Sequence, residues 1–214
     1  MTRFTLHPEL SPDLARLFRE EHRSLFKQAE FISQNKERTI RQFESGGNFY
    51  IVKRYGEKKL RRTLQSLLGM SQAVNSFKSS QKLSTLGIRT PRHIFLASHL
   101  GFKLRESFLI MEKSHGRSFH GMIVNDSNKE IPDTIIRNIA QMISRLHCAG
   151  YAHGDLHSGN ILVDPDQTIE LIDLDGITTR KRSRKKDLSR LLHALRNRPK
   201  SQQRLTELIQ DHTC

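Results

Sequence analysis

The sequence predicts an α+β protein of two lobes, with a small strand-rich lobe followed by a mainly helical one. Strand-like segments crowd the first half of the chain, the strongest helical pattern occupies residues 132–150, and two short strands and two helices follow it. The 214 residues, 36% of them hydrophobic, suffice for one domain with a buried core. We therefore expect a single domain over residues 1–214, with the small lobe at about 1–113 and the helical lobe at about 114–214.

The first half alternates helical and strand patterns. Residues 12–31 predict a helix and a connection. The segments RTIRQFE and FYIVKRY, separated by SGGN, predict a β-hairpin because both are rich in strand formers and two glycines suit a tight turn. Residues 64–86 predict a helix, and residues 87–98 and 106–114 predict two further strands. The expected inward positions of that helix are Leu67, Leu68, Val74, Phe77, Leu83 and Leu86.

The second half begins with the most regular helix, residues 132–150, which opens on Pro-Asp and ends at a glycine. Two strands at residues 160–164 and 169–174 follow, joined by the turn PDQT. Residues 185–197 predict a helix with Asp187 as its cap, and residues 201–212 predict the last one. The apolar stripe of the first helix consists of Ile135, Ile136, Ile139, Met142, Ile143 and Leu146.

The charge is strongly basic, with 36 Lys and Arg against 22 Asp and Glu, a net +14. Such a surface attracts nucleic acid, anionic lipid or phosphorylated substrates. Two basic runs, Lys53–Arg62 and Arg180–Lys186, concentrate the charge, although a merely solvated surface is the alternative. The sequence has no secretory signal and no apolar run of membrane-spanning length, and its two cysteines form no disulfide framework. We therefore expect a protein of the reducing cytoplasm.

The stretch YAHGDLHSGNILV, from Tyr151, concentrates ionisable and amide groups beside an apolar strand. Asp155 and Asn160 lie in this stretch, and Asp173 follows the next strand, so a hairpin would bring the three side chains to one edge. Carboxylate and amide oxygens suit Mg²⁺ together with substrate phosphates. Lys53 adds a cation inside an apolar strand, where a lysine usually needs an anionic partner. These groups are the requirements of phosphoryl transfer from ATP.

The spacing also matches known motifs. HGDLHSGN has the form H-x-D-x-x-x-x-N of the kinase catalytic loop, and IDLDG stands where kinases have D-F-G. With GIRTPRHIF before them and KKDLSRLLHAL after them, these motifs resemble a protein-kinase-like fold. Within that fold the chain resembles the bacterial lipopolysaccharide core kinases, which phosphorylate Kdo or heptose. The resemblance runs from Lys53 to about Arg196.

The resemblance implies a role for each matching residue. Asp155 would be the catalytic base, Asn160 and Asp173 would bind Mg²⁺, and Lys53 would hold the α- and β-phosphates of ATP. The backbone around Met111, Glu112 and Lys113 would hold adenine, His157 would touch the γ-phosphate or the substrate, and His153 would support the loop.

The resemblance also implies partners and a location. The substrate would be a lipid-linked sugar of the lipopolysaccharide core, and nucleic acid is not an expected partner. The basic runs would contact an anionic membrane surface, so a cytoplasmic enzyme peripheral to the inner membrane is expected. The sugar, the hydroxyl that accepts phosphate and the oligomeric state remain open.

Several kinase features are absent from the sequence. The turn at Ser33–Arg38, which stands where the phosphate loop is expected, has no glycine, and no glutamate in AVNSFKSSQKL is available to pair with Lys53. No A-P-E segment follows Asp173, which favours a small kinase for a non-protein hydroxyl. The rival interpretations are a small basic protein kinase linked to tRNA modification, and a pseudokinase or nucleic-acid-binding module without turnover. For single residues, Lys53 on the surface of an edge strand and Asp175 as a turn residue are the structural alternatives.

Overall fold

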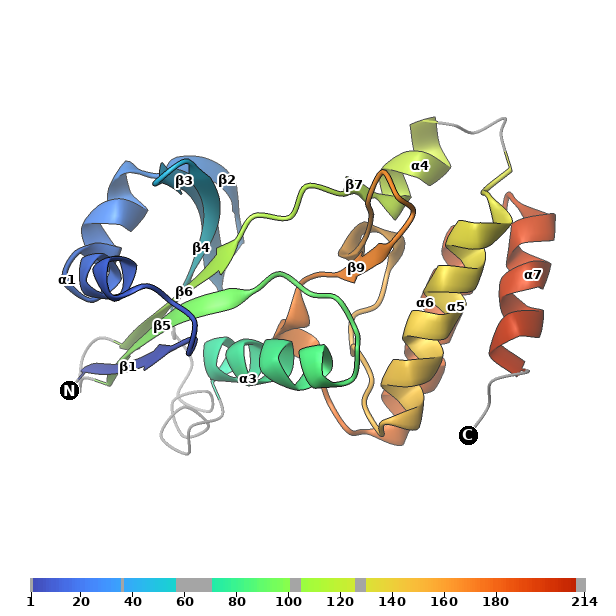
Figure 1. Ribbon diagram of the computed structural model, residues 1–214. Helices are drawn as coiled ribbons and strands as arrows, with labels where there is room; N and C mark the ends of the chain where they lie inside the picture. The colour runs from blue at the N-terminus through green and yellow to red at the C-terminus, as the bar shows by residue number, and fades with distance from the viewer. Residues whose placement is uncertain (1, 36, 57–70, 101–104, 126–129, 211–214) are drawn as a thin grey trace. The chain divides into compact units, whose positions relative to one another are not determined.

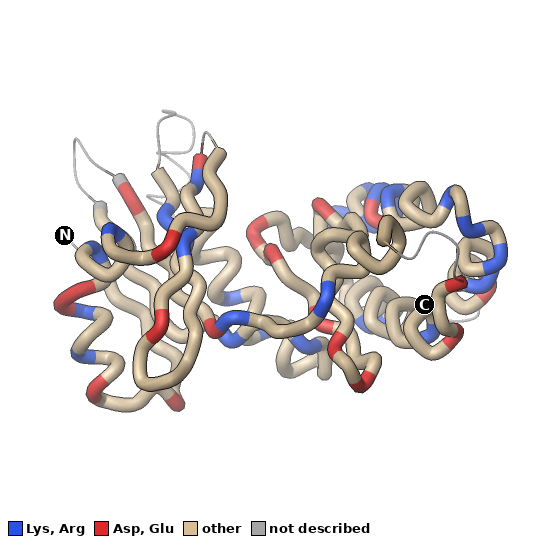
Figure 2. Tube along the Cα trace, turned by 90° about the horizontal axis from the view of Figure 1, so that it is seen from above, with Lys and Arg blue, Asp and Glu red and all other residues tan. Residues whose placement is uncertain are grey.

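The computed structural model describes residues 2–35, 37–56, 71–100, 105–125 and 130–210. The chain divides into two compact units. Unit 1 comprises Met1–Gln81 and Pro91–Lys113, and unit 2 comprises Lys82–Thr90 and Ser114–Cys214. Lys and Arg positions are spread over both units (Figure 2).

Unit 1 is built on an antiparallel sheet of six strands, in the order β1-β5-β6-β4-β3-β2 (Figure 1). Two helices accompany the sheet, and the apolar side chains on its two faces belong to separate clusters, one including residues of α1 and the other residues of α3. The strands are β1 (Thr2–Leu6), β2 (Glu30–Gln34), β3 (Arg38–Ser45), β4 (Asn48–Gly56), β5 (His93–Leu100) and β6 (Arg105–Glu112), and the helices are α1 (Pro12–Gln28) and α3 (Gln72–Thr85).

The hairpin of β3 and β4 confirms the expectation from the sequence. Gly46 and Gly47 both have positive φ, 59° and 74°, as a two-residue hairpin turn of this hand requires. Along β4, Tyr50 and Val52 belong to the core on the α1 side, whereas Ile51 and Tyr55 belong to the core on the α3 side. This alternation follows from the two-residue period of a strand.

The segment expected as a helix and a connection forms α1 and then strand β2. Helix α1 begins where Ser11 accepts a hydrogen bond from the Leu14 N–H at 3.4 Å, with Pro12 in the first turn. The strands β1 and β2 were missed because they are short and nearly all of their side chains are exposed. They therefore lack the half-buried alternation that identifies a strand in a sequence.

Unit 2 combines a small antiparallel sheet, β7-β8-β9, with helices. The long helix α5 buries the whole apolar stripe expected from the sequence, and α7 packs along it, as Figure 1 shows. The elements are β7 (Arg117–Ser118), α4 (Phe119–Asn125), α5 (Asp133–Cys148), the 3₁₀ turn η1 (Ser158–Asn160), β8 (Ile161–Val163), β9 (Ile169–Leu171), the 3₁₀ turn η2 (Leu174–Gly176), α6 (Lys181–Ala194) and α7 (Pro199–Gln210).

Two expectations need correction, and a third is tested only in part. Helix α6 begins at Lys181 rather than residue 185, so Asp187 lies inside the helix and does not cap it. The helix expected over residues 64–86 is described only as α3, because residues 64–70 lie outside the described residues. Cys148 is disulfide-bonded rather than a free thiol, and Cys214 lies outside the described residues. None of the helices in the described part of the chain combines the length and apolar character that crossing a membrane requires.

Candidate active site

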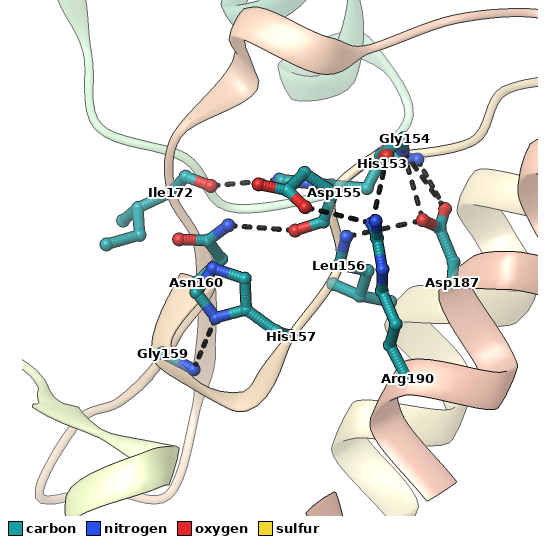
Figure 3. Close-up of polar contacts among 10 residues, drawn as sticks. All are labelled: His153, Gly154, Asp155, Leu156, His157, Gly159, Asn160, Ile172, Asp187 and Arg190. Atoms are coloured by element: carbon teal, nitrogen blue, oxygen red, sulfur yellow. Dashed lines mark hydrogen bonds and ion pairs between the residues drawn. The ribbon is translucent and has the colours of Figure 1, made fainter. Parts of the chain in front are cut away.

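The polar loop of residues 151–160 connects α5 to β8 through η1. Asp155 lies in this loop with 59% of its side chain exposed, whereas Asn160 is only 6% exposed. The Asn160 amide nitrogen donates to the Asp155 carbonyl oxygen at 2.9 Å (Figure 3). The backbone carbonyl oxygen of Asn160 accepts a hydrogen bond from the Ile172 N–H at 3.0 Å. Asn160 therefore joins the loop to the segment that carries Asp173.

Asp173 comes directly after β9 and Ile172 and precedes η2. Its backbone is left-handed, with φ 62° and ψ 57°, a conformation that an aspartate adopts more readily than most residues. The Ile172 carbonyl oxygen accepts a hydrogen bond from His153 Nε2 at 2.9 Å. The chain segments that carry Asp155, Asn160 and Asp173 are thus joined by hydrogen bonds within unit 2.

His153 is the buried support of the loop. Burial lowers its pKa, and this effect outweighs the carbonyl of Ile172 and the nearby carboxylates of Asp187, Asp173 and Asp155, which raise it. The neutral ring must carry its proton on Nε2, because a carbonyl oxygen can only accept. His153 therefore acts as an uncharged donor that fixes the loop against the strand following it.

Asp187 is the anchor that sequence reasoning missed. Its fully buried carboxylate accepts hydrogen bonds from the N–H groups of His153 at 2.7 Å, Gly154 at 3.1 Å and Leu156 at 3.3 Å. Burial by itself would raise the pKa of Asp187, but nearby His147 and these three N–H groups hold it below its usual value. His147 Nε2 lies 3.7 Å from Asp187 Oδ2, which is ion-pair range but too long for a hydrogen bond.

A signal for Asp187 was present in the sequence. It is the one acidic residue of α6, within KRSRKKDLSRLLHA, and it follows the basic run directly. A lone carboxylate in such a helix is expected to have a specific partner. The partners are backbone N–H groups more than thirty residues away in sequence, which local patterns do not reveal.

Gly154 stands where many kinases have an arginine, and the structure gives the reason for a glycine. Its φ is +81°, and a Cβ at this position would clash with the carbonyl oxygen of Gly176. A Cβ at Gly176 would in turn lie 2.9 Å from the carbonyl oxygen of His153. The two glycines allow the loop and η2 to approach closely, next to the bridge between Ala152 and Thr178.

Arg190 is a second residue that sequence reasoning missed. Its Nη1 donates to Asp155 Oδ1 at 2.9 Å and to the Gly154 carbonyl oxygen at 3.1 Å (Figure 3). Arg190 lies three residues after Asp187 on α6, so the two side chains project from neighbouring positions. One helix therefore provides both the buried anchor of the loop and a cation at the candidate base.

His157 occupies an exposed position within the loop. Its Nδ1 accepts from the Gly159 N–H at 3.1 Å and so caps η1. The Nδ1 atom is thereby occupied, and the exposed side chain lies in the wall of a cavity that also contains Asp155. Asp175 lies within η2, next to Gly176, in the turn position that the sequence also allowed.

Lys53 belongs to unit 1 and is only 6% exposed. It pairs with Ile40 of β3 and Leu109 of β6, so β4 is an interior strand. The alternative of a surface lysine on an edge strand is therefore wrong. By the alternation along β4, Lys53 lies on the same face as Ile51 and Tyr55, which is the face that α3 covers.

The backbone N–H groups of Glu112 and Lys113, in the segment expected to hold adenine, already form hydrogen bonds within unit 1. The Glu112 N–H donates to the Arg92 carbonyl oxygen and the Lys113 N–H to that of Phe49, both at 3.0 Å. The Lys113 ammonium donates to Gln42 Oε1 at 2.8 Å. An adenine ring bound here would therefore have to form hydrogen bonds with backbone carbonyl groups of this segment or with N–H groups beyond Lys113.

The turn between β2 and β3 occupies the position of the expected phosphate loop, Ser33–Arg38. Asn35 Oδ1 accepts from the N–H groups of Glu37 and Arg38, both at 2.9 Å. An asparagine side chain thus closes this turn in place of glycines. The two N–H groups are thereby occupied, so neither of them is available to bind a phosphate.

Comparison with known proteins identifies the family. The sequence pattern of the "Lipopolysaccharide kinase (Kdo/WaaP) family" matches residues 18–211. A 3-deoxy-D-manno-octulosonic acid kinase of Xylella fastidiosa is 33% identical over 129 residues, 58% of this chain and 50% of that protein. The enzyme of the same name from Vibrio parahaemolyticus is 26% identical over 129 residues, 59% of this chain and 53% of that protein. The matched part of the chain thus spans about half the length of these curated relatives.

A solved structure described as "WaaP in complex with acyl carrier protein" has the same fold, with a TM-score of 0.69. The likeness covers 98% of this chain and 89% of the other at 20% identity, so it concerns the fold alone. The predicted α+β, protein-kinase-like fold is therefore confirmed. Because the family pattern covers nearly all of the sequence, the chain belongs to the lipopolysaccharide kinase (Kdo/WaaP) family.

Proposed function

We propose that this chain is an ATP-dependent kinase that phosphorylates a sugar hydroxyl of the lipopolysaccharide inner core, on Kdo or heptose. The observation that carries the proposal is the presentation of Asp155. Its carboxylate is exposed, yet its loop is fastened by Asn160 on one side and by the buried Asp187 on the other. A general base needs this combination of access and fixed position. The family supports the reaction class.

Asp155 would accept the proton of the sugar hydroxyl as its oxygen attacks the γ-phosphorus of ATP. A new oxygen–phosphorus bond forms, the bond between the γ-phosphorus and the β,γ-bridging oxygen breaks, and ADP leaves. Arg190 holds one oxygen of the Asp155 carboxylate, so the other oxygen can face the hydroxyl. His157 would touch the γ-phosphate or the sugar.

The residues around Asn160 and Asp173 fit Mg²⁺. The amide nitrogen of Asn160 is used by the Asp155 carbonyl, which leaves its Oδ1 as a ligand oxygen, and Asp173 supplies a carboxylate. Mg²⁺ is commonly held by one or two such groups together with waters and phosphates. When bound, the ion would neutralise charge on the phosphates. In unit 1, Lys53 would hold the α- and β-phosphates and the segment of Glu112 and Lys113 would hold adenine.

The arrangement of the chain would be a single kinase-like domain, with an N-terminal lobe to about residue 113 and a C-terminal lobe after it. The substrate would be a lipid-linked sugar of the core, and the names of the relatives, both 3-deoxy-D-manno-octulosonic acid kinases, support Kdo as one candidate for that sugar. The first half of α6 supports contact with an anionic membrane surface, where each cation contributes about 1 kcal/mol. Five exposed cations lie there or at the residue before the helix: Arg180, Lys181, Arg182, Lys185 and Lys186. Replacing them with serine should weaken binding to vesicles that contain anionic lipid, and unchanged binding would remove this part of the proposal.

The rival interpretations have less support. A protein kinase linked to tRNA modification is disfavoured because the family pattern covers residues 18–211. A pseudokinase would have no reason to keep an exposed carboxylate paired with Arg190 on a loop with three backbone anchors.

The deciding experiment measures transfer of labelled γ-phosphate from Mg-ATP to a Kdo-containing lipid A acceptor, with lipid-free reactions as controls. Asp155→Asn should lower kcat by about 10²–10⁴-fold while ATP binding is retained. Asp173→Asn should weaken Mg-ATP binding as well. Absence of transfer by the unmodified protein to any Kdo- or heptose-containing acceptor would overturn the proposal.

A further inference from the structure

A cavity of about 810 Å³ lies within unit 2 and has Asp155 in its wall. Three elements form it: helix α4, the polar loop, and the C-terminal half of α6 with the turn that follows. The cavity belongs to one unit. Its lining consists of His120, Ile123, Val124, Asp155, His157, Ser158, Ser189, Arg190, His193, Ala194, Arg196, Asn197 and Arg198.

The lining of the cavity carries more cationic than anionic side chains. It contains three arginines but a single carboxylate, that of Asp155, and its other polar side chains are histidines, serines and one asparagine. Sites for neutral sugars need acceptors as well as donors for hydroxyl groups, whereas arginine offers donors only. Guanidinium groups match the geometry of carboxylate and phosphate. The composition of this cavity therefore favours an anionic ligand.

Two of the three arginines have hydrogen-bond donors to spare. Arg198 is 4% exposed and donates to the Ile123 carbonyl oxygen at 2.8 Å, so it supports the wall. Arg190 uses only Nη1, for Asp155 and the Gly154 carbonyl, and Arg196 uses only Nη1, for His193 Nε2 at 2.7 Å. Within the described residues, the Nη2 and Nε groups of both Arg190 and Arg196 have no acceptor.

The available donors lie close to the candidate base. His193 follows Arg190 by three residues on α6, so both lie on the helix face that lines the cavity. Arg196 is hydrogen-bonded to His193 and extends the cationic wall beyond the helix. On the other wall, His120 Nδ1 lies 3.2 Å from Ser158 Oγ, and Ile123 and Val124 provide an apolar surface. A ligand with an anionic group, hydroxyls and an apolar ring face is complementary to these walls.

We infer that this cavity is the acceptor site and that it selects a sugar acid, with Arg190 and Arg196 binding its carboxylate while one hydroxyl faces Asp155. The inference rests on the proposed function and narrows it, because Kdo carries a carboxylate and a neutral heptose does not. Arg196 is a specificity-determining residue without contact to the base. Arg190 both binds the acceptor and holds Asp155. The transfer step is unchanged: the proton goes to Asp155 and ADP leaves.

The test measures binding of free Kdo by calorimetry without ATP, in parallel with a neutral heptose of similar size. The unmodified protein should bind the sugar acid at least tenfold more tightly than the neutral sugar. Arg196→Gln should remove most of this preference, Arg196→Lys should retain part of it, and Lys200→Gln, which removes a charge outside the cavity, should leave it unchanged. Circular dichroism checks that the variants fold.

The kinetic arm separates binding from chemistry. With a Kdo-containing acceptor, Arg196→Gln should raise the acceptor KM about tenfold and leave kcat and the KM for ATP nearly unchanged. Arg190→Gln should raise the acceptor KM and lower kcat as well. Equal affinity for charged and neutral sugars, or an unchanged preference in both glutamine variants, would overturn the inference.

The two proposals fail in distinguishable ways. If the protein binds Kdo through Arg196 but transfers no phosphate to any core sugar, the proposed function is wrong and the acceptor site survives as an anion site. If the protein phosphorylates the sugar with an unchanged KM in both arginine variants, the proposed function stands and the assignment of this cavity is wrong.

Discussion

Unit 1 and unit 2 position their candidate site residues by different physical means. In unit 2, a loop of little apolar content is held by buried polar contacts, above all the Asp187 carboxylate and the ring of His153. In unit 1, Lys53 lies in an interior strand whose sheet is held by apolar clusters on both faces. Polar anchoring is directional and fixes single atoms, whereas apolar packing fixes a whole surface. We therefore expect substitutions in the apolar clusters of unit 1 to act mainly on stability, and substitutions at the polar anchors of unit 2 to act on stability and catalysis together.

The largest effect is expected in the aromatic cluster of unit 1. Phe18 is fully buried, with ring centroids 5.7–6.1 Å from Phe43, Tyr50 and Phe95. Phe18→Ala should lower the free energy of unfolding by about 3–5 kcal/mol, because it removes transfer energy and leaves a cavity. Urea unfolding followed by circular dichroism measures this, since the chain has no tryptophan. Phe31→Ala, at a side chain 55% exposed, is the control and should change stability by less than about 0.5 kcal/mol. Equal effects of the two would contradict the assigned core.

The next effect is expected at the polar anchor of unit 2. Asp187→Ala removes the acceptor of three backbone N–H groups and should cost about 3 kcal/mol, on the order of 1 kcal/mol for each group left unsatisfied. Phosphate transfer should fall with it, because the loop that carries Asp155 loses its anchor. Lys185→Ala, at an exposed position of the same helix, serves as the matched control. A cost of about 1 kcal/mol or less would be typical of the loss of a helix cap. It would support the expectation from the sequence that Asp187 caps a helix, and contradict its role as the anchor of the loop.

A third effect tests the close approach of loop and 3₁₀ turn in unit 2. Gly154→Ala places a Cβ against the Gly176 carbonyl oxygen at a φ of +81°, so it should cost about 2 kcal/mol or more and displace Asp155. Transfer activity and urea unfolding are both measured. Gly56→Ala in unit 1 meets no atom within 4 Å and should be nearly neutral. Full transfer activity in Gly154→Ala would contradict the prediction that the added Cβ displaces Asp155.

The sequence revealed unit 2 better than unit 1, for a physical reason. In unit 2 the motif residues Asp155 and Asn160 lie five positions apart and interact directly, so their spacing carries the geometry. Helix α5 was equally clear because its apolar stripe is regular. Asp187 and Arg190 escaped, since their partners are backbone and side-chain groups more than thirty residues distant.

In unit 1 the sheet order places β4 between β3 and β6, and the expected strand and hairpin patterns did not contain that pairing. The sequence therefore did not decide whether Lys53 is buried, although its position in an apolar strand correctly favoured burial. The Asn35 turn also escaped, because an asparagine that closes a turn through its side chain has no glycine signature. Long-range pairing thus accounts for most of what was missed.

The smallest expected effect is on the pH dependence of stability, to which the histidine pair His22 and His99 contributes in unit 1. In unit 1, His22 Nδ1 lies 2.9 Å from the Phe18 carbonyl oxygen and must donate to it, so His22 Nε2 can only accept from His99 Nε2 at 3.0 Å. Thr2 Oγ1 lies 2.8 Å from His99 Nδ1, which therefore accepts the hydroxyl proton. Protonation of His22 would set its Nε2–H against the Nε2–H of His99, whereas protonation of His99 would only reverse its hydrogen bond with the Thr2 hydroxyl. Burial lowers the pKa of both histidines, and the charge of nearby Arg23 adds to this, although Glu106 opposes it.

The sign of the pH dependence follows from these lowered pKa values. Below the usual histidine pKa of 6.5 the unfolded chain binds protons that the folded protein excludes, so stability is complete above this pH and falls as the pH drops through the window beneath it. The slope is at most about 1.4 kcal/mol per pH unit for each proton. His22→Gln, which keeps a donor and an acceptor but does not titrate, should reduce this slope and leave the share of His153 in unit 2, whose pKa burial also lowers. Urea unfolding between pH 7.5 and 5 measures the slope, and an identical slope in the variant would show that His22 does not contribute to the acid sensitivity, which would then come from His99 and from unit 2.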